Sequence, residues 1–253
     1  MKAMLDFIFD YSESGRWKKP FAAHDVGTYP LANGQTYQGD MPVEETGNML
    51  IMTTAIAIAD GNADYAAKHW EILTAWSNYL AEAGMDPENQ LCTEDFAGHL
   101  AHNANLSAKA IMAIAGYGRL AEMLNKPEEA KKFTEMAKRM AIEWERRADD
   151  GDHYRLAFDM PGTWSQKYNF VWDKVLGLNI LPDRIMKKEV TFYLKTQNKY
   201  GLPLDNRFTW GKTDDTVWSA TMADSEGDFQ ELIRPIWKYV NETSSRVPLG
   251  DWY

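Results

Sequence analysis

The stretch NLSAKAIMAIAGYG, residues 105–118, is apolar or small-residue-rich around most of its helical circumference. PEEAKKFTEMAKRMAIEWERRAD, residues 127–149, follows it closely and places its charged residues on one helical face. A helix that is apolar on all sides is buried, whereas an amphipathic helix lies at the surface of a domain. The two stretches therefore predict an inner and an outer helix, joined as an antiparallel hairpin because the link between them is short.

The same arrangement recurs along the chain, and each predicted hairpin is preceded by a longer segment rich in Gly, Pro, Asp and Trp. Inner and outer helices that alternate through hairpins are typical of an α/α solenoid or toroid, and pair spacings of roughly 50 to 65 residues favour the toroid. We therefore predict an all-α toroid whose long connections gather at one end of the ring. The expected helix pairs are 42–60 with 62–84, 99–124 with 127–148, 165–178 with 182–197, and 214–223 with 227–241.

The amino-acid composition disfavours several classes of function. The chain has 253 residues and a net charge of −10, which disfavours nucleic acid and anionic membrane surfaces as partners. It contains no apolar run long enough to span a membrane, and its single cysteine, Cys92, cannot form an internal disulfide. Ten Trp, twelve Tyr and ten Phe exceed the needs of a core of this size, and such a surplus often lines ligand grooves.

The two ends of the sequence suggest part of a larger protein. The first residues lie inside an amphipathic segment, and the last ones, RVPLGDWY at 246–253, form an aromatic-rich turn. We therefore expect residues 1–253 to form a single α/α-toroid domain that is truncated at both ends.

Polar residues lead into the helix expected at 42–60. His24 and Asp25 lie in the preceding loop, Glu44 and Glu45 fall in the first helical turn, and Asn48 follows Glu44 by four residues. Acids near a helix N-terminus can simply complement the helix dipole. Two adjacent acids and an amide at the head of an apolar helix also favour a functional role, and His24 with Asp25 could act as an acid–base pair.

A second polar group occupies residues 91–110, LCTEDFAGHLAHNANLSAKA. Asp95 ends a loop, and the spacing of His99, His102 and Asn103 predicts one shared helix face. The two histidines with Asp95 could bind zinc, but the HExxH spacing is absent and H-x-x-H alone is a weak signal. We favour a solvent-lined cavity wall over a metal site.

The remaining two expected inner helices are also entered through carboxylates and aromatic rings. Trp172 and Asp173 lie in PGTWSQKYNFVWDKVLGLN, residues 161–179, where a half-buried helix with aromatic packing is the alternative interpretation. In PLDNRFTWGKTDDTVWSA, residues 203–220, Asp214 lies one turn before Trp218. The loop before that helix carries Asp205, Arg207 and Trp210.

Carboxylates at the start of every expected inner helix predict a shared polar cavity. Paired carboxyl groups beside aromatic rings suit hydrolysis, since one acid protonates the leaving group and another activates water. Amide hydrolysis usually requires an activated Ser, Thr or Cys, or a metal-bound water. Cys92 could serve as that nucleophile, although a buried structural cysteine is the favoured interpretation. No Rossmann, P-loop or GxSxG pattern is present in the right setting, and we expect no cofactor.

Several of these segments together resemble the glutaminase A family. They are FAAHDVGTYP (21–30), DMPVEETGNMLIM (40–52), LCTEDFAGHLAHNANLSAKAI (91–111), YNFVWDKVLGL (168–178), PLDNRFTWGKTDDTVWSATMA (203–223) and RVPLGDWY (246–253). The resemblance covers nearly the whole chain. It implies large secreted, periplasmic or cell-envelope proteins of bacteria and fungi, whose helical domain is similar to six-hairpin glycosidases and is accompanied by an N-terminal β-rich domain. It also implies hydrolysis of L-glutamine to glutamate and ammonia, but it transfers no catalytic residues.

We therefore expect a glutaminase-like hydrolase acting on a small molecule. The alternatives are a glycoside hydrolase that uses the same cavity, and a non-catalytic module that binds sugar or packs against a neighbouring domain. Asp95 and Glu45 are the expected acid–base pair. The other expected cavity carboxylates are Glu44, Asp173 and Asp214, and the expected substrate-binding residues are His24, Asp25, Asn48, His99, Asn103, Trp172, Asp205, Arg207, Trp210 and Trp218.

Overall fold

The computed structural model describes residues 2–245 and 249–253, and at Asp95 it describes the backbone alone. The described residues form helices and isolated β-bridges but no β-strand, which confirms the all-α prediction. The start of the RVPLGDWY stretch and Met1 lie outside the described residues. The elements are α1 (Lys2–Glu13), α2 (Pro42–Asp60), α3 (Asp64–Lys68), α4 (Trp70–Ala83), η1 (Asp95–Ala97), α5 (Ala104–Met123), α6 (Pro127–Ala148), η2 (Tyr168–Phe170), α7 (Val171–Val175), α8 (Asp183–Thr196), α9 (Thr213–Thr221) and α10 (Glu226–Glu242).

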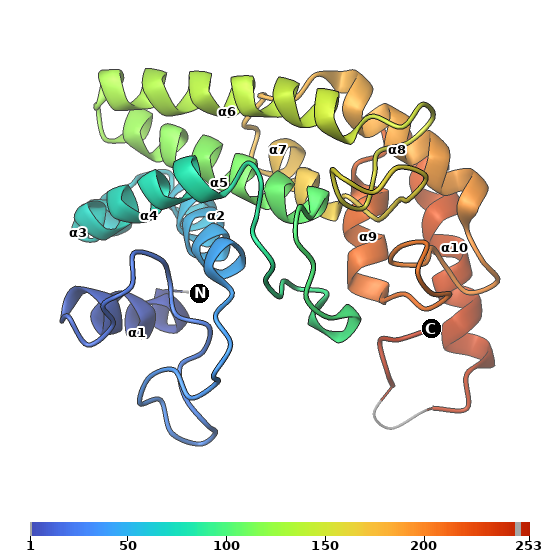
Figure 1. Cartoon of the computed structure of the whole chain (residues 1–253), viewed down its shortest axis with the longest axis horizontal. Coiled ribbons are helices and arrows are strands. Elements are labelled where there is room, and N and C mark those ends of the chain that lie inside the picture. The colour runs from blue at the N-terminus through green and yellow to red at the C-terminus, as the bar shows by residue number, and fades with distance from the viewer. Residues whose placement is uncertain (1, 246–248) are drawn as a thin grey trace.

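The helices follow one another in an arc, from α1 and α3 at one side, through α5 and α6, to α9 and α10 at the other (Figure 1). Within the arc, α5 packs along α6 and α2, α4 packs on both α2 and α5, and α9 packs against α10. The segments before α2 and before α5 lie on the same side of the arc, below the helices in this view (Figure 1). These two long connections therefore lie on one side of the arc, as the helical-hairpin prediction requires. The extent of the domain, expected as one unit over 1–253, stays a prediction.

The hairpin of α5 and α6 has the predicted inner and outer character. Nearly every residue of α5 is buried, whereas α6 buries a single face that includes Phe133 and Trp144. The Trp144 indole donates a hydrogen bond to the Ala104 carbonyl at 2.7 Å, which fixes α6 against the start of α5. On its other side α5 approaches α2 closely at Gly116, where a Cβ atom would lie 2.6 Å from Oγ1 of Thr54.

Three predicted helices differ from the observed ones. The helix expected at 99–124 begins only at Ala104, because His102 adopts a left-handed backbone conformation with φ of 59°. The Asn103 side chain then caps α5 by accepting hydrogen bonds from the backbone N–H groups of Asn105 and Leu106. The shared helical face of His99, His102 and Asn103 was therefore a wrong prediction.

The helix expected at 62–84 is divided into α3 and α4 at His69, whose ring stacks on Phe9 of α1 at 4.0 Å. The helix expected at 165–178 is reduced to η2 and α7. The Gln166 backbone N–H donates instead to the Leu204 carbonyl at 2.7 Å, so this segment pairs with a distant loop rather than with itself. None of the described helices is both long and apolar enough to cross a lipid bilayer.

Candidate functional site

A buried polar cluster joins the first turn of α2 to the second turn of α5. The ammonium of Lys109 donates to Oε1 of Glu44 and, at 2.8 Å, to Oδ1 of Asn48. Glu44 is 2% exposed and Lys109 4%, so the pair is almost closed to solvent. Thr93, from the loop before α5, donates its hydroxyl to the same Glu44 oxygen. The second Glu44 oxygen accepts no hydrogen bond from the described residues.

The local sequence of α2 makes this contact possible. Pro42 occupies the first helical turn, where its missing N–H costs nothing. The Val43 N–H donates to the Gln90 side chain at 3.0 Å, which ties the turn to the loop before α5. Gly47 leaves room for the Lys109 stem, since a Cβ atom there would lie 2.7 Å from Cγ of Lys109. A glycine one turn into α2 therefore lets the lysine of α5 reach Glu44.

Glu45 lies beside this cluster but is only partly buried. Asn48 donates to its Oε2 at 3.3 Å. Burial, and secondarily the negative charge of Glu44, raise the pKa of Glu45 to about 7, while Lys109 and His24 oppose this rise. A partly accessible carboxyl with this pKa can both accept and release a proton near neutral pH.

Glu94 forms the second buried carboxylate network. Its Oε1 accepts hydrogen bonds from the Tyr168 hydroxyl at 2.7 Å and from the Asn105 amide at 2.9 Å. Its Oε2 accepts from the Cys92 thiol at 2.5 Å. Burial raises the pKa of Cys92 well above its ordinary value, and the charges of Glu94 and Glu44 raise it further. Cys92 is therefore held as a buried neutral thiol, the state opposite to that of a nucleophilic thiolate.

Asp215, in the first turn of α9, is completely buried. Neither of its carboxyl oxygens accepts a hydrogen bond from the described residues. Burial raises its pKa to about 8, with a further contribution from the charge of Glu94. Tyr168 lies within the same electrostatic environment, because burial and the charges of Glu94 and Asp215 raise the pKa of its phenol. Asp215 is therefore linked to the Glu94 network by electrostatic interaction and not by a hydrogen bond, although the two residues are distant in sequence.

Aromatic rings and one ion pair border these carboxyl groups. The Trp218 ring lies 5.6 Å from that of Tyr168 and 6.0 Å from that of Trp172. Arg207 is held by Asp205 at 2.6 Å and donates to the Ala97 carbonyl at 3.2 Å. The loop before α9 is therefore fixed to the segment that carries Glu94. Trp210, in the same loop, stacks on Phe208 at 4.2 Å and is partly exposed.

His24 and Asp25 adopt the adjacent pairing expected from sequence, with Nδ1 and Oδ2 3.1 Å apart. The His24 ring stacks on Tyr37 at 4.5 Å. Asp25 accepts backbone N–H groups from Gly27 at 2.9 Å and from Thr36 at 3.0 Å. Partial burial acts to raise the pKa of Asp25, but the hydrogen bonds from Thr36 and His24 lower it. Asp25 therefore shapes the loop, and His24 is the member whose charge reaches Glu45.

The structure does not bring all the expected residues into the cluster. Asp173 instead closes the turn between α7 and α8 by accepting the Ile180 N–H at 2.9 Å. Asp214 is exposed and has Lys212 as its ion-pair partner at 3.7 Å, because the next residue holds the inward position on α9. His99 is exposed in the loop, and Asn103 serves as the cap of α5. The side chain of Asp95 lies outside the described part of the chain.

Three of the buried charged residues, Lys109, Asp215 and Glu94, were not among the expected site residues. For Lys109 and Asp215 the sequence contains a pattern that could have identified them. Lys109 is a charged residue inside an otherwise apolar helix, which indicates a buried partner. Asp215 shares the buried face of α9 with Ser219, four residues later, whereas Asp214 does not. Glu94 lies in an irregular loop, where no periodicity distinguishes inward from outward positions.

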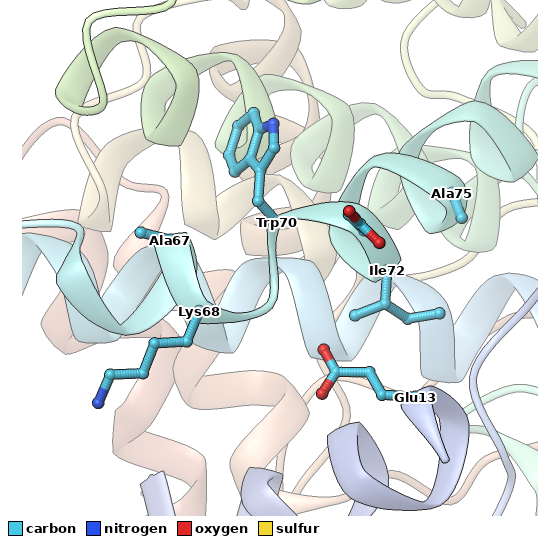
Figure 2. A pocket seen from close by; sticks show the side chains of 7 residues that line it. Glu13, Ala67, Lys68, Trp70, Ile72 and Ala75 are labelled. Carbon is cyan, nitrogen blue, oxygen red and sulfur yellow. The ribbon is translucent and has the colours of Figure 1, made fainter. Parts of the chain in front are cut away.

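A hollow of about 620 Å³ lies elsewhere, between α1 and the α3–α4 segment. Figure 2 shows Glu13 of α1 facing Ile72 of α4 there, with Ala67 and Trp70 on the same wall. None of the clustered carboxyl groups lines it, and Glu13 is already paired with His69 at 2.9 Å. Glu44 and Asp215 are both closed to solvent, and the central cavity expected from sequence stays a prediction. Within the described residues, no group of three or more His, Cys, Asp or Glu side chains is arranged to hold a metal ion.

Helical hairpins arranged in an arc, with buried carboxyl groups in the first turns of α2 and α9, define an all-helical domain built of helical hairpins. The whole chain, residues 1–253, matches the family described as the glutaminase A six helical-hairpin domain, and the chain belongs to this family.

Two relatives extend this finding. Over 260 residues the chain is 34% identical to Glutaminase A of Aspergillus oryzae, in an alignment that covers 100% of this chain and 38% of that protein. Over 338 residues it is 26% identical to a protein of Arthroderma benhamiae named Probable glutaminase, covering 99% of this chain and 39% of that protein. The chain therefore spans about two fifths of the length of these curated relatives.

Proposed function

We propose that this domain carries the hydrolytic site of a glutaminase-type protein, which converts L-glutamine and water to glutamate and ammonia. Membership of the glutaminase A six helical-hairpin family and the names of the two relatives support this proposal. The chemistry uses carboxyl groups and a water molecule, since Cys92 is a neutral thiol bound to Glu94.

The partial exposure of Glu45 and its raised pKa are the observations that support the mechanism. Its carboxyl group is partly accessible, and burial beside Glu44 raises its pKa to about 7. As a carboxylate it takes a proton from water, whose oxygen then attacks the amide carbon. Asn48 orients the Glu45 carboxylate through its hydrogen bond of 3.3 Å. We assign to His24, whose charge acts on Glu45, the role of positioning the amino acid portion of the substrate.

Glycoside hydrolysis is the second candidate, and the aromatic rings favour it. Trp218 lies between Tyr168 and Trp172, and Tyr168 donates a hydrogen bond to Glu94. Flat aromatic faces beside carboxyl groups suit the apolar faces of sugar rings, and two carboxyl groups in different protonation states suit glycosidic bond cleavage. Aryl glycosides and oligosaccharides should be turned over if this candidate is correct, and L-glutamine should not.

The decisive experiment measures ammonia release from L-glutamine by the intact protein and by its Glu45→Gln variant. We expect a loss of about 100-fold or more in kcat, the usual contribution of a general base. Glu71→Gln, which makes the same change at an exposed position of α4, is the matched control and should retain full activity. Undiminished ammonia release by Glu45→Gln would refute the assignment. Substrate binding without turnover of glutamine or glycosides would identify the domain as a non-catalytic module.

We also propose that the domain works within a larger secreted, periplasmic or cell-envelope protein that includes an N-terminal β-rich domain. The support is the length of the curated relatives, of which this chain covers 38% and 39%. Cell fractionation of the intact protein tests the location, and recovery of the protein from the cytosol would contradict it.

A further inference from the structure

Asp215 combines two features that rarely coexist in a purely structural residue. Its side chain is fully buried, and neither carboxyl oxygen accepts a hydrogen bond from the described residues. Buried polar groups are almost always paired, because leaving one unpaired costs free energy comparable to a lost hydrogen bond or more. A carboxyl group kept in this state is therefore prepared to interact with a group that comes from outside the chain.

The surroundings of Asp215 favour its protonated form. Burial has the largest effect, and the charges of Glu94 and Asp214 add to it, so its pKa rises to about 8. Lys212 and Lys109 oppose this rise without overcoming it. The neutral hydroxyls of Tyr168 and Tyr253 also face this carboxyl group, and its charge raises the pKa of both phenols.

Glu94 contrasts with Asp215 in the same network. It accepts three hydrogen bonds, from Tyr168, Asn105 and Cys92, whereas neither oxygen of Asp215 accepts one from the described residues. Asp215 therefore lacks a donor that would stabilise a negative charge, and this favours its role as a proton donor.

We propose that Asp215 is the proton donor to the leaving nitrogen in this site, a catalytic residue additional to Glu45. This inference rests on the proposed amide hydrolysis. As water attacks the amide carbon, one water proton passes to the Glu45 carboxylate. The C–N bond breaks, and its electron pair takes the Asp215 proton, so that ammonia leaves. Asp215 is then ionised and Glu45 protonated, and exchange with water restores both for the next turnover.

Because Asp215 is buried, a substrate can reach it only if some of the side chains that pack over it move. Tyr253 packs against the same turn of α9, since its hydroxyl bonds to Thr216 and, at 2.9 Å, to the Leu202 carbonyl. The Trp252 ring meets Phe96, of the segment that carries Glu94, at 4.1 Å. We expect these contacts of Trp252 and Tyr253 to open when substrate binds and to exclude water once it is bound.

The test compares two substrates of the intact protein, L-glutamine and the γ-(4-nitrophenyl) ester of glutamate. Ammonia needs a proton to leave, whereas 4-nitrophenolate leaves without one. We expect Asp215→Asn to lower kcat on glutamine about 100-fold or more, and on the ester less than about 10-fold. The alkaline limb of the wild-type pH profile, with a midpoint near pH 8, should vanish in the variant.

Asp224→Asn makes the same chemical change at an exposed position just after α9 and should leave both activities unchanged. Equal losses of Asp215→Asn on the two substrates would indicate a structural role and overturn the inference, as would full activity on glutamine. A wild-type protein that releases no ammonia would instead refute the proposed function itself, and with it the donor role of Asp215. Infrared spectroscopy gives a readout that needs no substrate. A protonated-carboxyl band at pH 7 that Asp215→Asn weakens and Glu45→Gln leaves in part supports the inference, and a band that Asp215→Asn leaves unchanged contradicts it.

Discussion

Glu44 and Lys109, which are 65 residues apart in the sequence, form an ion pair between α2 and α5 that is almost closed to solvent. The pair fixes the first turn of one inner helix against the second turn of another. Its neighbours Asn48 and Glu45 take their positions from it, because Asn48 accepts from Lys109 and donates to both glutamates. The proposed general base therefore depends on a contact that has no role in proton transfer.

Replacing Lys109 by Met should destabilise the protein by about 3–5 kcal/mol, because it leaves the Glu44 charge buried without a partner. Urea unfolding measures this loss. Lys2→Met is the matched control, since Lys2 pairs with Asp60 at 2.5 Å but both side chains are well exposed. Exposed pairs contribute about 0–1 kcal/mol. Equal effects of the two substitutions would show that the Glu44–Lys109 pair is not effectively buried.

Gly47→Ala should also destabilise the protein, by about 1–3 kcal/mol, because the new Cβ would lie 2.7 Å from Cγ of Lys109. Displacement of Lys109 should reduce activity as well. Gly227→Ala, in α10, gains the same helix propensity, and its Cβ would meet nothing closer than 3.7 Å. Thermal unfolding of both variants provides the comparison. A stabilised Gly47→Ala variant would contradict the close approach of α2 and α5.

The stability of the wild type should fall as pH rises from about 4 to about 8, through the contribution of Asp215. Its pKa is raised from 3.8 to about 8 on folding, so the folded state holds a proton that the unfolded state has lost. Stability from this group is complete below the unfolded pKa and disappears as pH approaches 8. Asp215→Asn removes this contribution and should gain up to about 1 kcal/mol relative to the wild type per pH unit, while the smaller contribution of Glu45 remains in both proteins.

Chemical denaturation at pH 5, 6, 7 and 8 checks this expectation. Asp224→Asn serves as the control, because it alters an exposed carboxylate just after the same helix. A constant difference between wild type and Asp215→Asn over this pH range would mean that Asp215 is ionised in the folded protein.

The acid limb of kcat/KM should have its midpoint near pH 7, where Glu45 titrates. Asn48→Leu should move this midpoint to higher pH, because the Asn48 hydrogen bond lowers the pKa of Glu45 by stabilising its charged form. Initial rates from pH 5 to 8 measure the shift. A midpoint that moves to lower pH, or does not move, would exclude Glu45 as the group that titrates.

Much of the fold could be predicted from local pattern. The 3.6-residue period of 127–148 and Pro127 at its start define α6, and Pro42 and Gly61 bound α2. These signals act over one or two helical turns and depend little on distant residues. The predictions failed where distant groups competed for the backbone, as at Gln166, whose N–H bonds to Leu204.

Local sequence patterns predicted only part of the candidate site. Glu44, Glu45 and Asn48 follow from the helix that carries them, and the structure does place them together. Asp214 and Asp173 were expected to line the cavity. The sequence pattern of a carboxylate beside an aromatic residue is the same whether the carboxylate faces the interior or the solvent. The structure turns Asp214 to solvent and uses Asp173 to close a turn.

By itself the sequence determined an all-helical chain of inner and outer helices, with acids where the inner ones begin, because helix periodicity and end signals are local. The tertiary structure alone decided which acids are charged. Burial and neighbouring charges raise the pKa of Asp215 and Glu45, and three hydrogen-bond donors surround the Glu94 carboxylate. Protonation depends on dielectric and on distances between residues far apart in the chain, and only packing sets those quantities.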